Sequence, residues 1–331
     1  MGLIDRFGRD HDDLRISVTD RCNLRCSYCM PIDPVWYPHE AILTYEEIAR
    51  LVRLTAGQGV RKLRITGGEP LVRRDLPVLI GMLTAIDGID DVSLTTNGVL
   101  LDRFAVDLVT AGLSRVNVSL DTLDPARFRN MTRRGGGLSD VLAGLAAAVR
   151  TGLTPVKVNA LIVRGVNEDD LEPLVERSRD EGWELRLIEY MPLENDGSWR
   201  PERVVHGEEL RRRISKRWPI ERDTDADVHA PAARWRFVDG RGKIGFIDSI
   251  SAPFCSSCSR LRLMSDGVFR SCLYDDVECD LKTPLRAGAS DAELLERIHE
   301  TVARKGRGGA LEILERRQVR PQTRTMHQIG G

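Results

Sequence analysis

Short apolar and β-branched runs alternate with longer amphipathic stretches through the first two thirds of the chain. The runs that we expect to form strands are residues 14–19, 62–66, 92–96, 115–120, 156–163 and 185–191. Thr44 and Glu47 make a capping box that predicts the start of a helix, and further helices are expected near residues 75, 102, 139 and 167. Strands that alternate with helices predict a parallel sheet of βα units. Six such units are fewer than the eight of a closed TIM barrel, so we predict an α/β fold with an incomplete parallel (β/α)6 TIM-like barrel.

The predicted strands carry polar side chains at alternate positions, whereas buried parallel strands are normally apolar throughout. The polar positions are Arg15, Ser17, Thr19, Lys62, Arg64, Thr66, Asn117, Ser119, Asp121, Lys157 and Asn159. If the apolar faces pack against helices, these polar faces point into the barrel. Unpaired buried charge is costly, so we expect the interior to hold water and a polar, anionic ligand. The alternative is a sheet with one face in solvent.

The pattern changes after residue 200, where a basic helix leads through an irregular acidic stretch into strand-like segments with glycine turns. We therefore expect a boundary near residue 220, with a partial barrel over 1–220 and a smaller C-terminal α+β domain over 221–331. Asp266-Gly267 predicts a hairpin turn between two short strands, and helical patterns occupy 291–303 and 308–319. The stretch "ARKGRGG" at 303–309 has little apolar content, and we predict that it is a solvated loop.

Composition narrows the possible partners. The 331 residues include 49 Lys plus Arg and 50 Asp plus Glu, and the resulting net charge of −1 gives no bulk reason to expect nucleic acid or membrane as a partner. No apolar run approaches the roughly 20 residues that span a bilayer, and the first residues lack the apolar core of a signal peptide. We therefore expect a cytoplasmic protein, and in that reducing compartment clustered cysteines are more often metal ligands or catalytic groups than disulfides.

Six of the seven cysteines form two sets of three. The first set is Cys22, Cys26 and Cys29 in "CNLRCSYC", and the second is Cys255, Cys258 and Cys272. A structural zinc site needs four protein ligands, and neither set has a fourth Cys or a nearby His. An iron–sulfur cubane held by three thiolates leaves one iron open to another ligand. One zinc shared between the sets, or a catalytic zinc with three thiolates and water, stays open. Cys279 could in principle be a fourth ligand, but its acidic surroundings disfavour the tight return that this needs.

The first set resembles the cluster motif of radical S-adenosylmethionine (SAM) enzymes. Tyr28 matches the aromatic residue that usually precedes the last cysteine, and "TGGEPL" at 66–71, "TTNG" at 95–98 and "NVSLD" at 117–121 match further patterns of that family. The resemblance implies that SAM chelates the open iron through its amino and carboxylate groups. It also implies that the reduced cluster, supplied by an electron donor, cleaves SAM to a 5′-deoxyadenosyl radical.

The second set makes the resemblance narrower. A radical SAM core with Cys-x2-Cys-x13-Cys near the C-terminus and a final Gly-Gly is similar to the GTP 3′,8-cyclase family of molybdenum cofactor (molybdopterin) biosynthesis. This implies two 4Fe-4S clusters with GTP between them, and a product that passes to a cyclic pyranopterin synthase. A homodimer is a further expectation, which the resemblance itself does not decide. Two other classes are alternatives: a two-cluster radical SAM peptide maturase, whose extension usually carries more cysteines, and a zinc-stabilised binding module.

The resemblance also implies roles for single residues. The cluster ligands are the six cysteines of the two sets. The SAM contacts are Tyr28, Gly68, Thr95, Ser119 and Met191. The GTP contacts are Arg15, Lys62, Arg64, Lys157, Arg186, Arg260 and Arg262. Catalytic roles fall on Arg15, Gly330 and Gly331, because the slim Gly-Gly end is expected to enter the barrel and position the substrate or an adjacent Arg. The alternatives are that Ser119 bonds only locally, Met191 is a core side chain, Arg262 faces solvent and the tail is frayed.

Overall fold

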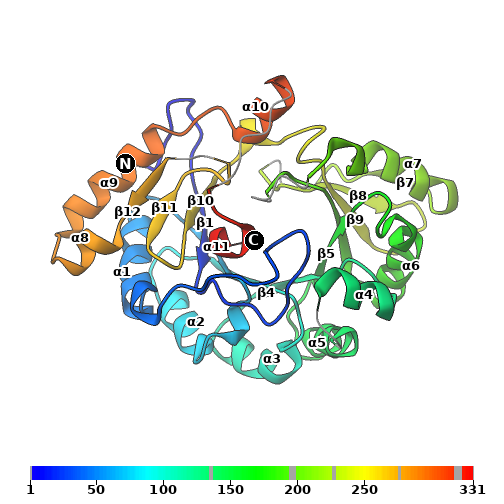
Figure 1. Cartoon of the computed structure of the whole chain (residues 1–331), viewed down its shortest axis with the longest axis horizontal. Coiled ribbons are helices and arrows are strands. Elements are labelled where there is room, and N and C mark those ends of the chain that lie inside the picture. Colours follow the sequence, from blue (N-terminus) through cyan, green and yellow to red (C-terminus); the bar gives the residue numbers. More distant parts are fainter. Residues whose placement is uncertain are drawn as a thin grey trace.

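A computed structural model of the chain describes residues 2–133, 137–193, 199–225, 229–274, 277–316 and 323–330. One 12-stranded sheet in the order β12-β11-β10-β1-β2-β3-β4-β5-β6-β9-β8-β7 forms its centre. Helices surround the curved sheet, and the short helix at residues 326–329 lies inside its curve (Figure 1). None of the described helices is both long and apolar enough to cross a bilayer.

The six predicted strands of the partial barrel are present within two residues of their expected bounds. They are β1 Asp13–Ser17, β2 Lys62–Thr66, β3 Asp91–Thr96, β4 Arg115–Ser119, β5 Lys157–Ile162 and β6 Glu184–Glu189. Each pairs in parallel with the next. Their apolar positions, such as Leu14, Ile16 and Val118, belong to one buried core cluster. The outward faces therefore pack against the helices, as the alternation predicted.

Seven helices accompany these strands in the described chain before residue 220. They are α1 Tyr45–Ala56, α2 Leu76–Thr84, α3 Leu101–Thr110, α4 Pro125–Thr132, α5 Leu138–Arg150, α6 Leu171–Glu181 and α7 Gly207–Arg217. The capping box at the start of α1 is confirmed, since Glu47 N–H donates to the Thr44 side chain and Thr44 N–H donates to Glu47. Helix α4 was not predicted, although Asp124 caps it and Pro125 opens it, which are recognisable start signals.

The residues after 217 extend both edges of the barrel sheet. Their strands are β7 Ile220–Arg222, β8 Ala233–Phe237, β9 Lys243–Ile247, β10 Arg260–Leu263, β11 Val268–Arg270 and β12 Glu278–Asp280. Strand β9 pairs in parallel with β6, and β10 pairs in parallel with β1. The predicted Asp266-Gly267 hairpin is present between β10 and β11. Whether residue 220 divides two domains stays a prediction.

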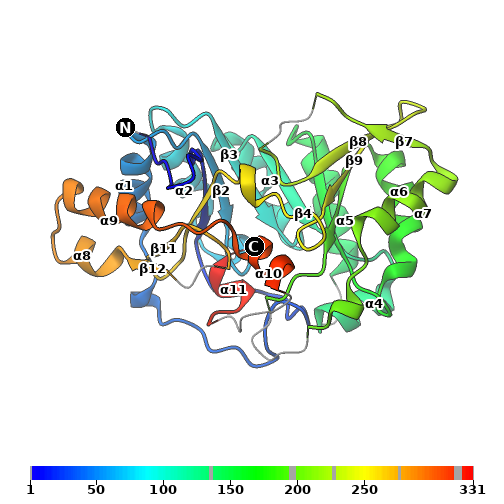
Figure 2. The ribbon, with the colours of Figure 1, turned by 90° about the horizontal axis from the view of Figure 1, so that it is seen from above.

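Four helices complete the described chain: α8 Lys282–Arg286, α9 Asp291–Ala303, α10 Gly309–Arg316 and α11 Met326–Ile329. Figure 2 shows α8 and α9 beside α1, while α11 lies near the barrel axis. The prediction of a solvated loop at 303–309 was wrong for Lys305, whose side chain is 1% exposed. Lys305 Nζ donates to the Arg260 carbonyl at 3.0 Å, and Arg9 donates to the carbonyls of Gly306 and Arg307. Contacts with remote segments therefore order this polar stretch.

Candidate functional site

The first cysteine set and the five predicted SAM contacts share one cavity. This cavity, of about 220 Å³, is lined by Cys22, Cys26, Cys29, Tyr28, Gly68, Thr95, Ser119 and Met191 among others. The cysteines lie on the loop that follows β1, and Gly68, Thr95 and Ser119 lie at or just beyond the carboxyl ends of β2, β3 and β4. That end of the strands is where barrel enzymes carry their sites.

The loop of the first cysteines rests on the end of α4. Arg25 N–H donates to the Thr132 carbonyl at 2.9 Å, and Ser27 N–H donates to the Met131 carbonyl at 2.9 Å. Within the loop, Cys29 N–H donates to the Cys26 carbonyl at 3.0 Å. The helix that the sequence analysis missed thus supports the first cysteine set.

The first three cysteines are free thiols in an environment that keeps them neutral when no metal is bound. Burial raises the pKa of Cys22 to about 11 and that of Cys26 to about 12. Burial, and then the charges of the two other cysteines, raise the pKa of Cys29 even further. A cationic cluster would supply the positive charge that turns such thiols into thiolate ligands. The donor set therefore fits a cluster held by three cysteines.

Gly68 and Glu69 hold the floor of this cavity. A Cβ at Gly68 would lie 2.4 Å from the Asp20 carbonyl oxygen, so only glycine fits. The buried Glu69 carboxylate accepts from Asn97 N–H and from Thr96 Oγ1, both at 2.7 Å. Burial raises the pKa of Glu69 to about 7. Glu69 was not assigned a role from the sequence, although it stands in the "TGGEPL" pattern.

Tyr28 and Asp121 form a second polar pair at the cavity wall. Tyr28 Oη donates to Asp121 Oδ2 at 2.5 Å, and Asp121 Oδ1 accepts from Leu161 N–H at 2.8 Å. Burial raises the pKa of Asp121 to about 6. This bond fixes the Tyr28 ring beside the cysteines. Asp121, like Glu69, was quoted within a motif but not singled out.

The second cysteine set lines a separate cavity of about 170 Å³, together with Arg15, Arg260 and Arg262. The hairpin between β10 and β11 brings Cys272 back toward Cys255 and Cys258, as predicted. Burial works to raise the pKa of Cys258, but the charges of Arg260 and Lys305 outweigh it and lower the pKa to about 6. Cys279, in β12, is not among the described residues that line this cavity; it pairs with Phe269 of β11 and packs against the core.

Both cavities contain thiol triads rather than sites for one ion. Among the described residues, no group of three or more His, Cys, Asp or Glu side chains is arranged to hold a single metal ion. A 4Fe-4S cluster needs a different arrangement, because each of its cysteine ligands binds its own iron atom. The cavities adjoin, since Asn159, Ile188, Met191 and Met326 line both of them. Met191 therefore lies between the two triads.

A row of guanidinium groups crosses the sheet inside the barrel. Arg262, Arg15 and Arg64 are direct register partners on β10, β1 and β2. Burial, and then the charges of Arg260 and Arg262, lower the pKa of Arg15 well below its usual value. Burial lowers the pKa of Arg64 and of Arg262 to about 10. Arg15 Nε and Arg64 Nε and Nη1 are buried without a hydrogen-bond partner in the described chain. Such a row fits a polyanionic ligand.

Three other predicted cationic residues have carboxylate neighbours that the sequence analysis did not foresee. Arg186 forms an ion pair with Glu184 at 2.7 Å, and Lys157 is the register partner of Glu184. Lys62 pairs with Asp12 at 3.0 Å and its side chain is 41% exposed. Lys62 therefore lies at the solvent-accessible start of β2, apart from the buried row.

The C-terminal tail enters the barrel. The Gly330 carbonyl oxygen accepts a hydrogen bond from Arg262 Nη1 at 2.7 Å. A Cβ at Gly330 would lie 2.5 Å from Thr66 Oγ1, and Gly330 has a φ of +85°, so glycine is required there. Arg262 is 4% exposed, so the alternative that it faces solvent was wrong. Gly331 lies outside the described residues.

Comparison with known proteins gives two family matches. The description "Radical SAM superfamily" matches residues 16–177, and "Molybdenum Cofactor Synthesis C" matches residues 183–310. A GTP 3′,8-cyclase of Rhodopirellula baltica is 46% identical over 339 residues, covering 100% of this chain and 92% of that protein. A GTP 3′,8-cyclase of Moorella thermoacetica is 47% identical over 328 residues, covering 99% of both chains. A solved structure of HydG, a hydrogenase maturase, has a TM-score of 0.49 at 16% identity and covers 61% of this chain and 48% of that one.

Proposed function

Because this chain belongs to the GTP 3′,8-cyclase family of radical SAM enzymes, which act in molybdenum cofactor synthesis, we propose that its substrate is GTP. The proposed product is (8S)-3′,8-cyclo-7,8-dihydroguanosine 5′-triphosphate. When bound, a reduced cluster with SAM would supply the 5′-deoxyadenosyl radical. This radical would take the ribose 3′ hydrogen and leave as 5′-deoxyadenosine, C3′ would bond to guanine C8, and one electron from the proposed donor with one proton would complete the 7,8-dihydro ring. The observation that carries this proposal is the buried arginine row beside two adjoining thiol triads.

Each triad would hold one 4Fe-4S cluster. Cys22, Cys26 and Cys29 would hold the cluster that binds SAM, and the cysteines at 255, 258 and 272 would hold the second cluster. Three thiolates leave one iron of each cluster open to a ligand that is not from the protein. The support is that both sets are free thiols that line cavities.

The proposed SAM contacts act by shape and by hydrogen bonding. Gly68 would contact SAM through its main chain, because the absence of a Cβ lets residues 20 and 21 pack closely behind it. Thr95 and Ser119 offer hydroxyl groups on neighbouring strands. Tyr28, whose Oη donates to Asp121 Oδ2 at 2.5 Å, would form one wall of the cofactor site. Met191 would contribute an apolar contact between the SAM and GTP cavities.

The proposed GTP contacts act by charge. These contacts include Arg15, Arg64, Arg260 and Arg262, which offer forked donors to phosphate and guanine oxygens. Those oxygens would be the acceptors that the buried nitrogens of Arg15 and Arg64 lack. Lys157 and Arg186 would contact the ligand from the same side, where Glu184 lies beside both of them. Lys62 would have to exchange Asp12 for a phosphate oxygen.

Catalytic roles are proposed for Arg15, Gly330 and Gly331. Arg15 lies next to Arg262 in register, and Arg262 bonds to the Gly330 carbonyl. Through Arg262, the tail would thereby hold Arg15 in place beside the reacting nucleotide. An electron donor and a cyclic pyranopterin synthase that takes the product are the proposed partners, and a homodimer stays a prediction.

The test is anaerobic reconstitution followed by iron counting and incubation with SAM, dithionite and GTP. We expect about eight irons per chain and the cyclised nucleotide as product. Alanine at all three cysteines of the first set should halve the iron and abolish SAM cleavage. Alanine at the second set should also halve the iron but leave uncoupled SAM cleavage, while Cys279→Ala should change neither. Four irons in the intact chain, or no cyclised product from a fully loaded one, would refute the proposal.

A further inference from the structure

The tail segment 323–330 ends in a helix too short to hold its own position. Helix α11 has four residues, and isolated helices of that length are unstable in water. Thr325 and Gln328 form a capping box, with Thr325 N–H donating to Gln328 Oε1 at 3.1 Å. This box closes the turn on itself but does not join it to the barrel. The position of α11 must therefore come from other contacts.

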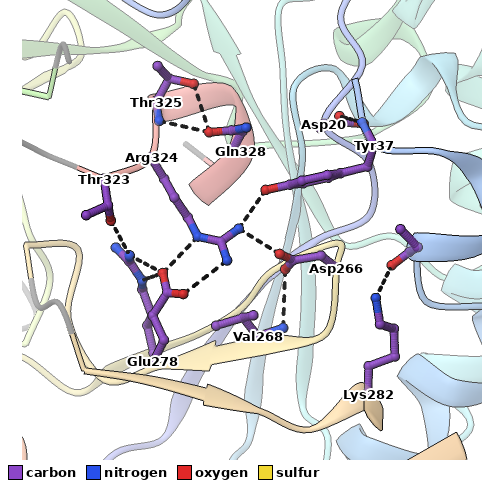
Figure 3. Close-up of polar contacts among 12 residues, drawn as sticks. Asp20, Tyr37, Asp266, Val268, Glu278, Lys282, Thr323, Arg324, Thr325 and Gln328 are labelled. Carbon is purple, nitrogen blue, oxygen red and sulfur yellow. Dashed lines mark hydrogen bonds and ion pairs between the residues drawn. The ribbon is translucent and has the colours of Figure 1, made fainter. Parts of the chain in front are cut away.

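Arg324, two residues before α11, makes several of those contacts with its whole guanidinium group (Figure 3). The others include the edge-on contact of His327 with Trp36 and the bond from Arg262 to the Gly330 carbonyl oxygen. Nε and Nη2 donate to the two carboxylate oxygens of Glu278 at 2.8 and 3.0 Å. Nη1 donates to Asp266 Oδ2 and to Tyr37 Oη, both at 2.6 Å. The Arg324 side chain is 16% exposed, so these bonds are largely shielded from water and from salt.

The partners of Arg324 come from three remote segments, and each is itself fixed. Tyr37 N–H donates to Asp20 Oδ2 at 2.6 Å, in the loop that carries the first cysteines. Asp266 lies in the hairpin that returns Cys272, where its Oδ1 accepts from Val268 N–H at 3.3 Å. Glu278 also accepts from the buried Arg270. Arg324 thus joins the tail to the segments that bear both thiol triads.

The electrostatics agree with this geometry. Burial works to lower the pKa of Arg324, but Glu278 and Asp266 outweigh it and raise the pKa. Burial, and then the charge of Asp266, raise the pKa of Tyr37 to about 12. The phenol therefore stays neutral at physiological pH and accepts from the guanidinium.

What Arg324 holds in place bears on the proposed reaction. Met326, two residues on, lines both cavities, and Gly330 accepts from the buried Arg262 at 2.7 Å. We infer that Arg324 is a positioning residue, whose fork to Glu278, Asp266 and Tyr37 fixes the tail between the two cavities and thereby couples radical formation to cyclisation. This inference rests on the proposed function, because it assigns Arg324 to that same site.

The test compares Arg324→Ala with Arg286→Ala. Arg286 is a matched control, since it also forks onto a glutamate, Glu47, at 2.7 and 3.0 Å, but on the outside of the barrel near α1. With Arg324→Ala, iron content and SAM cleavage should stay near those of the unaltered enzyme. Cyclised product per 5′-deoxyadenosine should fall by about tenfold to a hundredfold, as expected for a misplaced reacting group. Arg286→Ala should leave that ratio unchanged.

Hydrogen exchange of the cofactor-free chain gives a second readout. Amides of residues 326–330 should exchange at least about tenfold faster in Arg324→Ala, and Arg324→Lys should restore the ratio only in part because it lacks the planar fork. If Arg324→Ala fails to fold, Asp266→Asn removes one bond and should give the same change, smaller in size.

The outcomes separate the two proposals. Unchanged tail exchange, or full coupling in a folded Arg324→Ala chain, would overturn the positioning role. Faster tail exchange together with equal losses of SAM cleavage and of iron would also overturn it, since Arg324 would then be structural. If the unaltered enzyme makes no cyclised product, the proposed function fails, while the exchange result still decides whether Arg324 fixes the tail.

Discussion

Lys157 is a cation whose charge depends on conditions near neutral pH. Burial, and then the charge of Arg186, lower its pKa to about 7, although Glu184 opposes this. Below that pH the ammonium is charged and attracts phosphate. Above it the neutral amine loses most of that attraction. Burial, together with the neighbouring cations, therefore lets this one cation of the barrel interior lose its charge near neutral pH.

We therefore predict that GTP binds more weakly as the pH rises above about 7, and that binding takes up protons. One lost charge-assisted contact is worth about 1.5–3 kcal/mol, or roughly tenfold or more in Kd. Titration calorimetry in buffers of different ionisation enthalpy would measure both effects. Lys157→Arg, which stays charged, should flatten the pH dependence. The same pH dependence in that variant would assign the effect to another group.

In the ligand-free chain, Lys157 should make folding more favourable as the pH rises, whereas it makes GTP binding less favourable. The unfolded Lys157 keeps its proton up to about 10.5, whereas the folded one loses it near 7. Between these values the unfolded state binds more protons, so the contribution of Lys157 to the unfolding free energy rises with pH. Lys157→Met should remove this rise in a denaturant titration repeated across that range. A rise that persists in Lys157→Met would have to come from other residues.

Arg64 and Lys62 are two residues apart on β2, yet their environments differ. Arg64 has two buried nitrogens without partners, whereas Lys62 already pairs with Asp12 at 3.0 Å and is partly exposed. We predict that Arg64→Ala weakens GTP binding by about 1.5–3 kcal/mol, and that Lys62→Ala costs less than about 1 kcal/mol. Equilibrium binding of GTP measures both. A larger loss at Lys62 would mean that the phosphates lie at the outer end of β2.

At the scale of elements, α5 packs directly onto the turn that follows β3. A Cβ at Gly144 in α5 would lie 2.4 Å from the Gly98 carbonyl oxygen and 3.0 Å from Leu101 Cβ. The turn belongs to the "TTNG" segment that carries Thr95 and Asn97 into the first cavity. This close approach therefore connects helix packing to the geometry of the cavity.

Gly144→Ala should lower the unfolding free energy by about 1–3 kcal/mol, because backbone atoms would have to move apart. Gly81 in α2 is the matched control, since a Cβ there meets nothing within 4 Å. Gly81→Ala should raise stability by about 0.5–1 kcal/mol through better helix propensity. Urea unfolding of the ligand-free protein under reducing conditions compares them. Equal stability of the two variants would show that α5 can shift at no cost.

Local sequence signals predicted most helices and strands, whereas contacts between residues far apart in the chain could not be predicted from the sequence. Strand alternation located β1 to β6, and the capping box at Thr44 depends only on neighbours in the chain. The burial of Lys305 depends on the Arg260 carbonyl, 45 residues away in sequence. No pattern within 303–309 encodes that contact, so its polar composition favoured a solvated loop.

The same division holds for the site. The resemblance to radical SAM motifs singled out the first three cysteines and the five proposed SAM contacts, and these residues do share one cavity, because they are fixed relative to strand ends. The carboxylate partners Glu184 and Asp12 and the anchor at Arg324 could not be found this way. They depend on strand register and on a tail that returns from the far end of the chain.

At the scale of the whole molecule, the residues after 217 complete the sheet on both sides. Strand β10 covers the open edge of β1, and β9 covers the open edge of β6. The net charge of −1 gives no hint of the cationic row, because that row lies across three neighbouring strands. The arrangement also explains why the second triad lies beside Arg15: the hairpin that carries Cys272 is built on the neighbour of β1.

This sharing of one sheet predicts how a truncated chain behaves. Residues 1–220 alone would leave β1 and β6 as edge strands with unpaired backbone groups, which promote aggregation. They would also lose buried side chains such as Leu261 and Phe246 from the core cluster. Because a domain has only about 5–15 kcal/mol of net stability, we expect the fragment to aggregate or to melt without a cooperative transition. Size-exclusion chromatography and thermal circular dichroism would measure this, with co-expressed residues 221–331 as the rescue control. A monomeric fragment that melts like the full chain would instead support an independent barrel domain ending near residue 220.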